Sequence, residues 1–427
     1  MNLKAFYLSF LLLVLSLILK CRSSRVIELS DRFLDVRKDA DWLIMFYSPN
    51  CAHCKRLDPV WSHVAQGLHY TNIRVGKIDC SRFTKIAYEF GIAGFPTIMF
   101  LKGDSKQFVF NGDRTKDEII NFAHRVQGPP VKQITRPESL EALRSSENIF
   151  FLYAGSPESS LFELFYNTAE RFQPHSFFYS TSLEIAENLF ETRSNPVILV
   201  HKEKTPYIFN DWSENEDLNE TLSNWVNHER FATFVKVTRG NFHQLMQIDK
   251  FLVIAVIHEN KLEEIPPEMV EFRDMVESII HNNRDRFHRR FQFGWTGSPD
   301  LANSIAMMEL QLPHLIVVNA STNHHHIPQD EPQHLTPEAI TLFLESIENQ
   351  MAPAYGGDTF LVRLYRGYFE GRTAFREMWR GNPVLTAVLF GLPLGFLLLI
   401  LYSVCCSDIL DADEEEEEEE STHEKKE

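Results

Sequence analysis

Cysteine is scarce in this sequence: its 427 residues include six, and none lies between Cys80 and Cys405. The long middle of the chain therefore contains no thiol, which excludes thiol chemistry there. Basic residues are also in the minority, since the formal net charge is −17 and the run from Asp411 to Glu420 supplies nine negative charges. A nucleic-acid partner is therefore not expected.

Long apolar runs occur only near the two ends of the chain. Ala5 to Leu19 is uncharged and follows Lys4, a pattern typical of a secretory signal peptide (residues 1–23) that is cleaved after about Ser23 or Ser24. The alternative is an uncleaved anchor, but the run is short for a membrane span. Pro383 to Cys406, by contrast, is long enough to cross a bilayer and contains no charged side chain.

A signal peptide and a late span together predict a type I membrane protein. Residues 24–382 would lie on the luminal side, 383–406 would span, and the acidic tail 407–427 would be cytosolic. One pattern opposes this orientation, because arginines cluster just before the span and the positive-inside rule alone would place them in the cytosol. That rule weakens for large translocated domains, so the predicted orientation follows from the signal peptide. These arginines are Arg363, Arg366, Arg372, Arg376 and Arg380.

Residues 24–128 alternate between strand and helix patterns. Trp42 to Tyr47 is continuously apolar, as in a strand buried on both faces, and Cys54 to Gly67 has helical periodicity. Strands that alternate with helices predict an α/β sheet. The later expected elements are Asn72–Ile78, Thr84–Phe90, Thr97–Leu101, Phe108–Phe110 and Thr115–Val126.

A proline directly before an apolar run recurs three times. Pro96, Pro196 and Pro313 occupy these places, and they are 100 and 117 residues apart, about the size of one small domain. The recurrence predicts three tandem units, at 24–128, 129–230 and 231–352, of which only the first contains cysteine.

Cys51 and Cys54 carry the chemistry of the first unit. They are separated by Ala52 and His53, follow the buried strand and open the helix. The helix N-terminus stabilises a thiolate at Cys51, and a protonated His53 would add positive charge. Cys54, one turn later, could then resolve a mixed disulfide. The pattern predicts a redox-active Cys51–Cys54 disulfide.

Two other interpretations of this pair are possible. A structural zinc site would need a further Cys or His pair at ligand spacing, and none is evident near Cys80. An inert structural disulfide is also possible, although so tight a loop at a helix start is strained and exposed. The order of strand, motif, helix and later proline favours redox chemistry. Neither a metal nor another cofactor is predicted.

Residues 26–127 resemble the catalytic thioredoxin-fold domain of the protein disulfide isomerase family. Beyond the cysteine pair, the match includes Phe46-Tyr47, Lys55, Gly91 and Gly94-Phe95-Pro96-Thr97. The arrangement of one catalytic unit, two inactive units and a span is similar to that of membrane-anchored members. The resemblance implies three thioredoxin-like domains and a disulfide oxidoreductase or isomerase of the endoplasmic reticulum. Its implied partners are unfolded or partly folded secretory and membrane proteins and the lipid bilayer.

The family's residue roles extend to matching positions. By this resemblance Cys51 is the nucleophile, Cys54 the resolving thiol and Pro96 a cis-proline that faces the disulfide. Lys77 matches a buried lysine and Arg114 a mobile arginine that modulates the second thiol. Both could equally be ordinary surface cations.

Three departures from the family pattern concern this site. Asn50 replaces a tryptophan, Ala52 replaces a glycine, and Met45 replaces a buried acid that in the family relays the proton of the second thiol. Active and weakened enzymes both fit these departures. The second hypothesis is therefore a membrane-tethered binding adaptor with weak redox activity.

Smaller signals concern modification and location. Asn219 and Asn319 begin glycosylation sequons. Lys425, third from the end, resembles part of a dilysine retrieval signal and predicts contact with retrieval machinery. Cys80 is expected to be a free thiol. Cys405 and Cys406 could be palmitoylated or could simply pack within the span.

Two further segments have alternative interpretations. The segment 353–382 is basic and amphipathic, and we expect it on the luminal membrane surface unless it is a solvated spacer. His324-His325-His326 could bind a metal, but a polar hairpin loop is favoured.

Overall fold

The computed structural model describes residues 25–103, 106–190, 196–210, 217–260, 262–330 and 335–423, with backbone only at 188, 189 and 405–423. The predicted signal peptide and Lys425 lie outside the described residues. The chain divides into two compact units. Unit 1 comprises Met1–Ala255, Ile265–Thr296 and Asn319–Ser321, and unit 2 comprises Val256–Glu264, Gly297–Val318 and Thr322–Glu427.

The first sheet in unit 1 has the strand order β1-β3-β2-β4-β5. β1 and β2 are parallel to β3, while β4 is antiparallel to both β2 and β5. The strands are β1 (Ile27–Leu29), β2 (Asp41–Tyr47), β3 (Ile73–Asp79), β4 (Thr97–Lys102) and β5 (Lys106–Val109).

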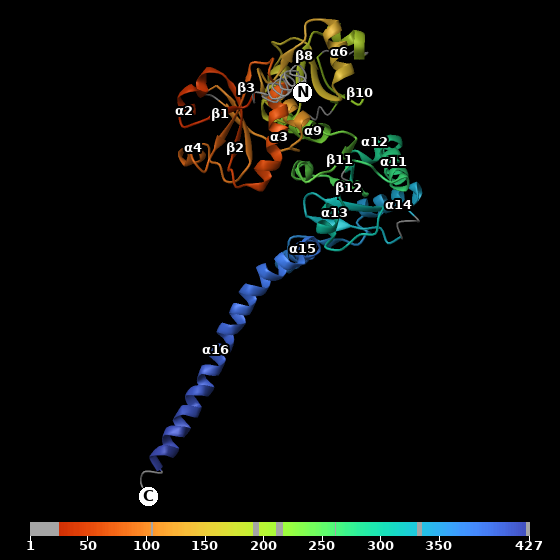
Figure 1. The fold of residues 1–427 in the computed structure, drawn as a ribbon. Coiled ribbons are helices and arrows are strands. Elements are labelled where there is room, and N and C mark those ends of the chain that lie inside the picture. The colour runs from red at the N-terminus through yellow and green to blue at the C-terminus, as the bar shows by residue number, and fades with distance from the viewer. Residues whose placement is uncertain are drawn as a thin grey trace, which may run out of the picture. The chain divides into compact units, whose positions relative to one another are not determined.

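Helices cover both faces of this sheet, which explains the unbroken apolar run of β2 (Figure 1). Leu43 and Met45 face a core that includes residues of α3 (Ala52–Gly67) and α5 (Lys116–Val126). Trp42, Ile44 and Phe46 face the opposite core, which includes residues of α2 (Phe33–Val36) and α4 (Thr84–Glu89). The short helix η1 (Arg37–Asp39) precedes β2. The predicted elements are therefore present, with ends shifted by one or two residues.

The second sheet has the order β10-β9-β7-β8-β6, which repeats the order of the first when it is read from β6. Its strands are β6 (Lys132–Gln133), β7 (Ile149–Ala154), β8 (Phe178–Thr181), β9 (Val197–Lys202) and β10 (Thr205–Ile208). The helices of this region are α6 (Pro137–Ser146), α7 (Ser160–Phe172), α8 (Leu183–Phe190) and α9 (Leu218–Glu229).

The remaining strands are ordered β11-β13-β12-β14-β15-β16. The first five strands have the same order as the strands of the other two sheets. This supports a thioredoxin-like fold with mixed parallel and antiparallel strands. The strands are β11 (Phe234–Lys236), β12 (Phe251–Val256), β13 (Phe291–Thr296), β14 (His314–Asn319), β15 (His324–His326) and β16 (Tyr355–Gly356). The helices are α10 (Phe242–Met246), α11 (Pro267–Asn282), α12 (Arg284–Phe287), α13 (Pro299–Ala306) and α14 (Pro337–Glu348). The domain limits remain predictions.

The interpretation of the histidine triplet as a polar loop is wrong. His324–His326 forms β15, which pairs antiparallel with β14 and with β16. His325 and His326 are buried, and burial lowers the pKa of His325 to about 4. The backbone pairing of the strand outweighs the polarity of its side chains, which had suggested a loop.

A buried group of charges lies at the C-terminal end of α9 in unit 1. The carboxylate of Glu229 accepts hydrogen bonds from Lys202 at 2.7 Å and Arg284 at 3.1 Å, and lies 2.5 Å from His288 Nε2. The Lys202 side chain is 0% exposed. Burial alone would raise the pKa of Glu229, but the bond to His288 and the two cations hold that pKa well below its ordinary value.

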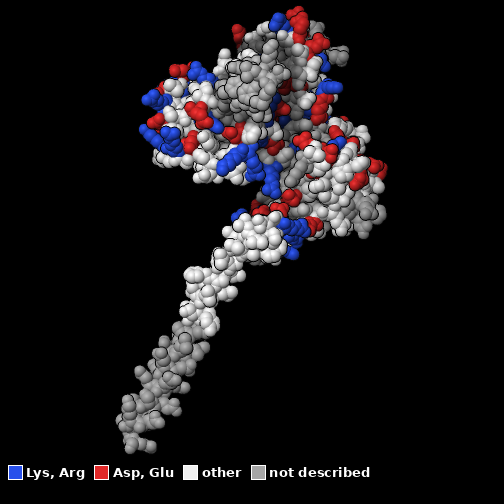
Figure 2. Space-filling model, viewed as in Figure 1, with Lys and Arg blue, Asp and Glu red and all other residues white. Residues whose placement is uncertain are grey.

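Two consecutive helices close the described chain. α15 (Phe360–Gly381) is followed by α16 (Pro383–His423), whose segment Pro383–Val404 is long and apolar enough to cross a membrane, with a mean hydropathy of 2.6. Only 6% of that segment is buried within the protein. No charged side chain is visible along it in Figure 2. The apolar segment of this helix coincides with the predicted span, and the helix itself continues beyond that span.

Candidate active site

Cys51 is the N-cap residue of α3. Its backbone is extended, and its Sγ accepts a hydrogen bond from the Cys54 amide at 3.2 Å. The first amides of a helix have no partner within the helix, so an N-cap side chain that accepts from one of them stabilises the helix start. Here a sulfur atom fills that position, and a thiolate would fill it better than a thiol.

The surroundings of Cys51 favour its ionised form. A hydrogen bond from the Cys54 thiol is the largest influence that lowers the pKa of Cys51, and the backbone amides of Cys54 and His53 and the charge of Arg114 act in the same direction. Desolvation opposes them without reversing the shift. Both cysteines are reduced in this structure. Cys51 is therefore the thiol of the pair that is better prepared to attack.

His53 lies beside Arg56 at the start of α3. Its Nδ1 lies 2.9 Å from the guanidinium of Arg56. The backbone amide of His53 also acts on Cys51 and lowers the pKa of that thiol.

Cys54 is buried, with 3% of its surface exposed. Burial first, and then its bond with Cys51, raise the pKa of Cys54 from the ordinary 9.0 to about 11. The pKa values of the two thiols, which are three residues apart, are thus shifted in opposite directions. Attack by Cys51 is favoured, and ionisation of Cys54 is the difficult step.

The loop before β4 lies against Cys51. The Phe95–Pro96 peptide bond is cis, and the Cys51 thiol lies 3.6 Å from the carbonyl oxygen of Phe95. The Phe95 side chain is 39% exposed beside this contact. Sequence reasoning placed Pro96 at this site, and the structure brings it there. Leu312–Pro313 is also cis, while Asn195 lies outside the described residues.

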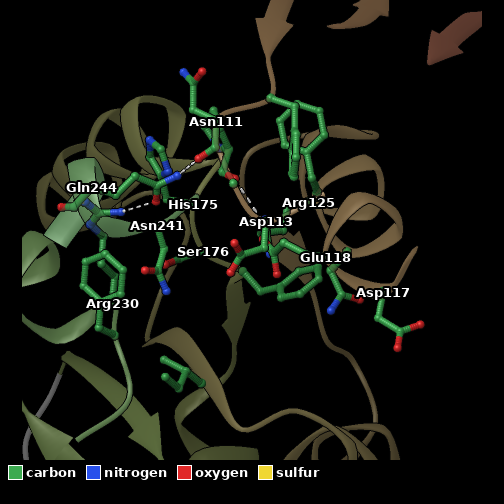
Figure 3. A pocket seen from close by; sticks show the side chains of 18 of the residues that line it. Asn111, Asp113, Asp117, Glu118, Arg125, His175, Ser176, Arg230, Asn241 and Gln244 are labelled. Atoms are coloured by element: carbon green, nitrogen blue, oxygen red, sulfur yellow. Dashed lines mark hydrogen bonds and ion pairs between the residues drawn. The ribbon is translucent and has the colours of Figure 1, made fainter. Parts of the chain in front are cut away.

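Arg114 reaches the same loop from the segment between β5 and α5. Its guanidinium donates to the carbonyl of Pro96 at 3.1 Å. The segment is held in turn by residues far along the chain within unit 1. The Thr238 hydroxyl donates to Asp113 at 2.6 Å, and the Gln244 amide donates to the carbonyl of Asn111. Nothing in the sequence signalled these two contacts, which Figure 3 shows in part.

A polar pocket lies beside this contact. It has a volume of about 570 Å³, and Arg125, His175, Arg230 and Gln244 contribute to its lining (Figure 3). Arg230 donates to the side-chain oxygen of Gln244 at 3.3 Å, and Arg125 pairs with Glu118 at 2.7 Å. Neither active-site cysteine lines this pocket. We therefore assign the chemistry to the Cys51 surface.

Lys77 is half-buried in β3 and is engaged by two carboxylates. Its ammonium lies 2.8 Å from Asp58 and 3.2 Å from Glu28. Burial would lower the pKa of Lys77, but the bonds to these two acids raise it overall. Lys77 also stands opposite Met45 in the parallel pairing of β2 with β3.

Met45 is 1% exposed and belongs to the core formed with Leu57 and Trp61 of α3. In the family that this segment resembles, this position carries a carboxylate. In this chain the same position is apolar and closed to solvent. Lys77, its neighbour in register, binds Asp58 and Glu28 instead.

Cys80 is separate from the exchanging pair. It is a free thiol, 3% exposed, and burial raises its pKa to about 11. Among the described residues, no group of three or more histidine, cysteine or acidic side chains is placed to hold a metal ion.

The two sequons differ in their surroundings. Asn219 is exposed in the first turn of α9. Asn319 is half-buried at the end of β14, and its side-chain oxygen accepts from the Ser321 amide at 2.9 Å. Asn219 is therefore the more accessible of the two acceptors.

Comparison with known proteins gives consistent matches along the chain. The thioredoxin family matches residues 27–125, and a thioredoxin-like domain family matches residues 154–346. Protein disulfide-isomerase TMX3 of Xenopus laevis is 34% identical over 393 residues, which cover 91% of this chain and 84% of that protein. The human protein of the same name is 32% identical over 385 residues, covering 89% and 82%.

Proposed function

The chain belongs to the protein disulfide isomerase family, and on that premise we propose that it assists oxidative folding in the lumen of the endoplasmic reticulum as a thiol–disulfide oxidoreductase and isomerase. Its substrates would be unfolded or partly folded secretory and membrane proteins. One observation carries the proposal: Cys51 caps α3, lies against the Phe95–Pro96 loop and has a lowered pKa, with Cys54 one turn behind it.

The reaction proceeds in two exchanges. The Cys51 thiolate attacks one sulfur of a substrate disulfide, forms a mixed disulfide and releases the other substrate sulfur as a thiolate. Cys54, after losing its proton, attacks Cys51 Sγ, so that the substrate leaves reduced and the Cys51–Cys54 disulfide forms. The reverse sequence oxidises a substrate dithiol. If a second substrate thiol attacks the mixed disulfide first, the substrate is isomerised and the enzyme pair is again reduced.

The site predicts different demands on the two exchanges. Cys51 is accessible and biased toward the thiolate, so the first exchange is favoured. Cys54 is buried in surroundings that raise its pKa. Arg114 contacts the Pro96 carbonyl beside the pair, and Lys77 is tied to Asp58 and Glu28. Of the two cations, Arg114 is the better placed to act on the cysteines.

A trapping experiment tests the enzymatic role. Cys54→Ala removes the resolving thiol, so mixed disulfides should accumulate on Cys51 and be recovered from cells by mass spectrometry. The matched control is the double variant Cys51→Ala and Cys54→Ala, which should trap nothing. If the single variant recovers no more mixed disulfide than the double variant, the enzymatic proposal fails. Function in cells that survives Cys51→Ala would favour the binding-adaptor hypothesis.

Attachment to the membrane and orientation form part of the same proposal. The apolar segment Pro383–Val404 supports a single span, with the thiol site in the lumen. Glycosidase-sensitive modification at Asn219, and to a lesser degree Asn319, is the expected mark of luminal exposure. The catalytic unit should also resist protease in sealed microsomes. Digestion there would overturn the orientation.

Retention would involve the cytosolic tail and the retrieval machinery. Lys425 stands third from the end of the sequence, a position that suits a dilysine-like signal. Replacing Lys425 and Lys426 with serine should move the protein to the cell surface. An unchanged distribution would mean that the span or luminal contacts retain it.

A further inference from the structure

One face of α15 is apolar, aromatic and exposed. Leu361, Tyr365, Tyr368, Phe375 and Trp379 recur three to seven residues apart and lie on one side of the helix. Their exposed fractions run from 43% to 74%. We call these five side chains the aromatic face. An exposed patch of this kind next to a helix that can cross a membrane indicates a binding surface.

A neighbouring side of α15, about a quarter turn around the helix from the aromatic face, is held against the protein. Its half-buried residues also recur every three or four positions: Val362, Arg366, Phe369, Thr373 and Arg376. Two contacts to the α13 region fix this side, since Ser304 donates to Glu370 at 2.7 Å and Arg376 pairs with Glu309. The helix therefore cannot roll to bury its aromatic face against its own unit.

The junction with α16 fixes the position of the aromatic face along the apolar segment Pro383–Val404. The rings of Phe375 and Phe390 meet edge to face with centroids 5.3 Å apart. Asn382 separates the two helices, and its side chain caps α16 by accepting from the Leu385 amide at 3.0 Å. The two helices therefore form a defined corner in which α15 contacts the side of α16.

Phe390 lies well inside the apolar segment. It follows Pro383 by seven residues, which corresponds to roughly 10 Å along a helix. Its side chain tilts back toward the helix N-terminus, so its ring lies somewhat shallower. An amphipathic helix at a bilayer surface buries its apolar face by about 5–10 Å. If α16 crosses a bilayer, the contact with Phe390 puts Phe375 at such a depth.

The remaining side chains of α15 suit the same position. Tyrosine and tryptophan favour the layer where headgroups meet acyl chains, because each has an apolar body and a polar tip. Arg372 is exposed and, at 3.6 residues per turn, falls on the same side of the helix as the aromatic face, so its guanidinium can reach phosphates. Phosphate groups complement this charge.

We propose that the aromatic face is a lipid-docking surface, and that its occupant is the phospholipid headgroup layer of the bilayer that α16 crosses. α15 then lies along the membrane surface and holds α13 close to it through Glu370 and Arg376. The inference rests on the membrane attachment proposed above. It adds a second, surface-parallel contact to the single span.

Site-directed spin labelling of the full chain tests this directly. Single cysteines are placed at Leu361 and Tyr368 on the aromatic face, at Ala374 on the exposed side away from it, and at Leu394 within the span. The other cysteines are replaced, and the protein is reconstituted in bilayers of phosphatidylcholine and phosphatidylserine. Accessibility to oxygen and to a water-soluble nickel chelate then reports the depth of each label.

The expected result separates the two faces of α15. Labels at Leu361 and Tyr368 should be accessible to oxygen and shielded from nickel, as the label at Leu394 should be, while Ala374 stays accessible to nickel. If Leu394 reports lipid but both faces of α15 are open to nickel, the docking surface is wrong and the anchor stands. If Leu394 itself is open to nickel, the anchor fails and the inference fails with it. Spin–spin broadening at Tyr368 would assign the face to a second copy and overturn the proposal.

A second measurement avoids the cysteine replacements. In the unmodified chain, a phosphatidylcholine with a photoactivatable group near its headgroup should crosslink to peptides from 360–381 as well as to the span. Crosslinks confined to the span would contradict the proposal. Tyr368→Glu should reduce the crosslinking of α15 several-fold, whereas Ala374→Glu should leave it unchanged.

Discussion

Replacing Met45 with glutamate should speed the second exchange of the reaction. Met45 is buried in the core beside α3, at the strand position where the family carries a carboxylate that relays the proton of the resolving thiol. A methionine cannot accept that proton. Lys77 stands opposite this position in register and could pair with an introduced carboxylate. Met45→Glu therefore supplies the missing base, and Lys77, which also binds Asp58 and Glu28, is the cation nearest to it in register.

The size of the effect follows from the pKa of Cys54. At pH 7 a thiol with the ordinary pKa of 9.0 is about 1% ionised, whereas one with a pKa of about 11 is about 0.01% ionised, a difference of about 100-fold. The more basic thiolate is more nucleophilic, and with a Brønsted coefficient of about 0.4–0.5 this raises the rate of attack by the thiolate roughly 6–10-fold. The net handicap is therefore at most about 10–16-fold, because in the mixed disulfide the bond to the Cys51 thiol is absent and only burial keeps the pKa of Cys54 raised. Met45→Glu should accelerate resolution by up to about 10-fold.

Single-turnover kinetics with a disulfide peptide separates the two exchanges. Formation of the mixed disulfide should be almost unchanged in Met45→Glu, and its decay should be faster. Met45→Gln is the matched control, because its amide has a similar size and polarity but accepts no proton at neutral pH. Both variants should lose about 1–3 kcal/mol of stability from burying a polar group, which denaturant unfolding would measure.

Two results would refute this reasoning. If the wild-type chain resolves the mixed disulfide as fast as it forms it, ionisation of Cys54 is not limiting. If Met45→Glu folds but decays no faster than Met45→Gln, the side chain at this position does not serve the proton of Cys54.

Three further predictions concern pH, the Arg114 segment and the buried charges. The decay of the mixed disulfide in the wild type should rise about tenfold per pH unit above pH 7, because burial keeps the pKa of Cys54 raised. The formation of the mixed disulfide should level off at a lower pH, because the pKa of Cys51 is lowered. Stopped-flow quenching would measure both rates, and parallel pH profiles would contradict the assignment. Thr238→Val removes the hydrogen bond to Asp113, which should loosen Arg114 and so raise the pKa of Cys51. Thiolate absorbance at 240 nm would report that pKa, and Thr238→Ser should restore the wild-type value. Glu229→Gln leaves Lys202 and Arg284 without their carboxylate and should lower the free energy of unfolding by about 3–5 kcal/mol at pH 7. Since the pKa of Glu229 is depressed, its contribution to stability is present above the ordinary glutamate pKa and is lost as pH falls. The difference in unfolding free energy between variant and wild type should therefore narrow in acid.

The sequence predicted the parts of this molecule that depend on local pattern. The apolar run of β2 indicated burial on both faces, and the order of strand, cysteine pair and helix placed Cys51 at the N-cap of α3. The recurring prolines marked the starts of β4, β9 and β14 in sheets of the same strand order. Each of these features is encoded within a few residues.

The features that the sequence did not predict depend on contacts between distant residues. Thr238 and Asp113 are 125 positions apart, and neither carries a signal for the other. The histidine triplet appeared polar and loop-like until pairing with β14 and β16 made it a strand. The pairing of His53 Nδ1 with Arg56 also depends on side-chain orientation, which residue type alone does not determine.

The burial of Cys80 has a practical consequence for measuring the state of this protein in cells. A thiol that is 3% exposed with a pKa of about 11 reacts slowly with alkylating reagents in the folded protein. Cys51 and Cys54 are the other free thiols in the described part of the chain. Cys54 shares these properties, since it is 3% exposed and has a pKa of about 11. A membrane-impermeant maleimide that is added from the side that bears the active site should therefore modify Cys51 alone, once if the pair is reduced and not at all if the pair is oxidised. Cys54 and Cys80 should react only after denaturation and reduction.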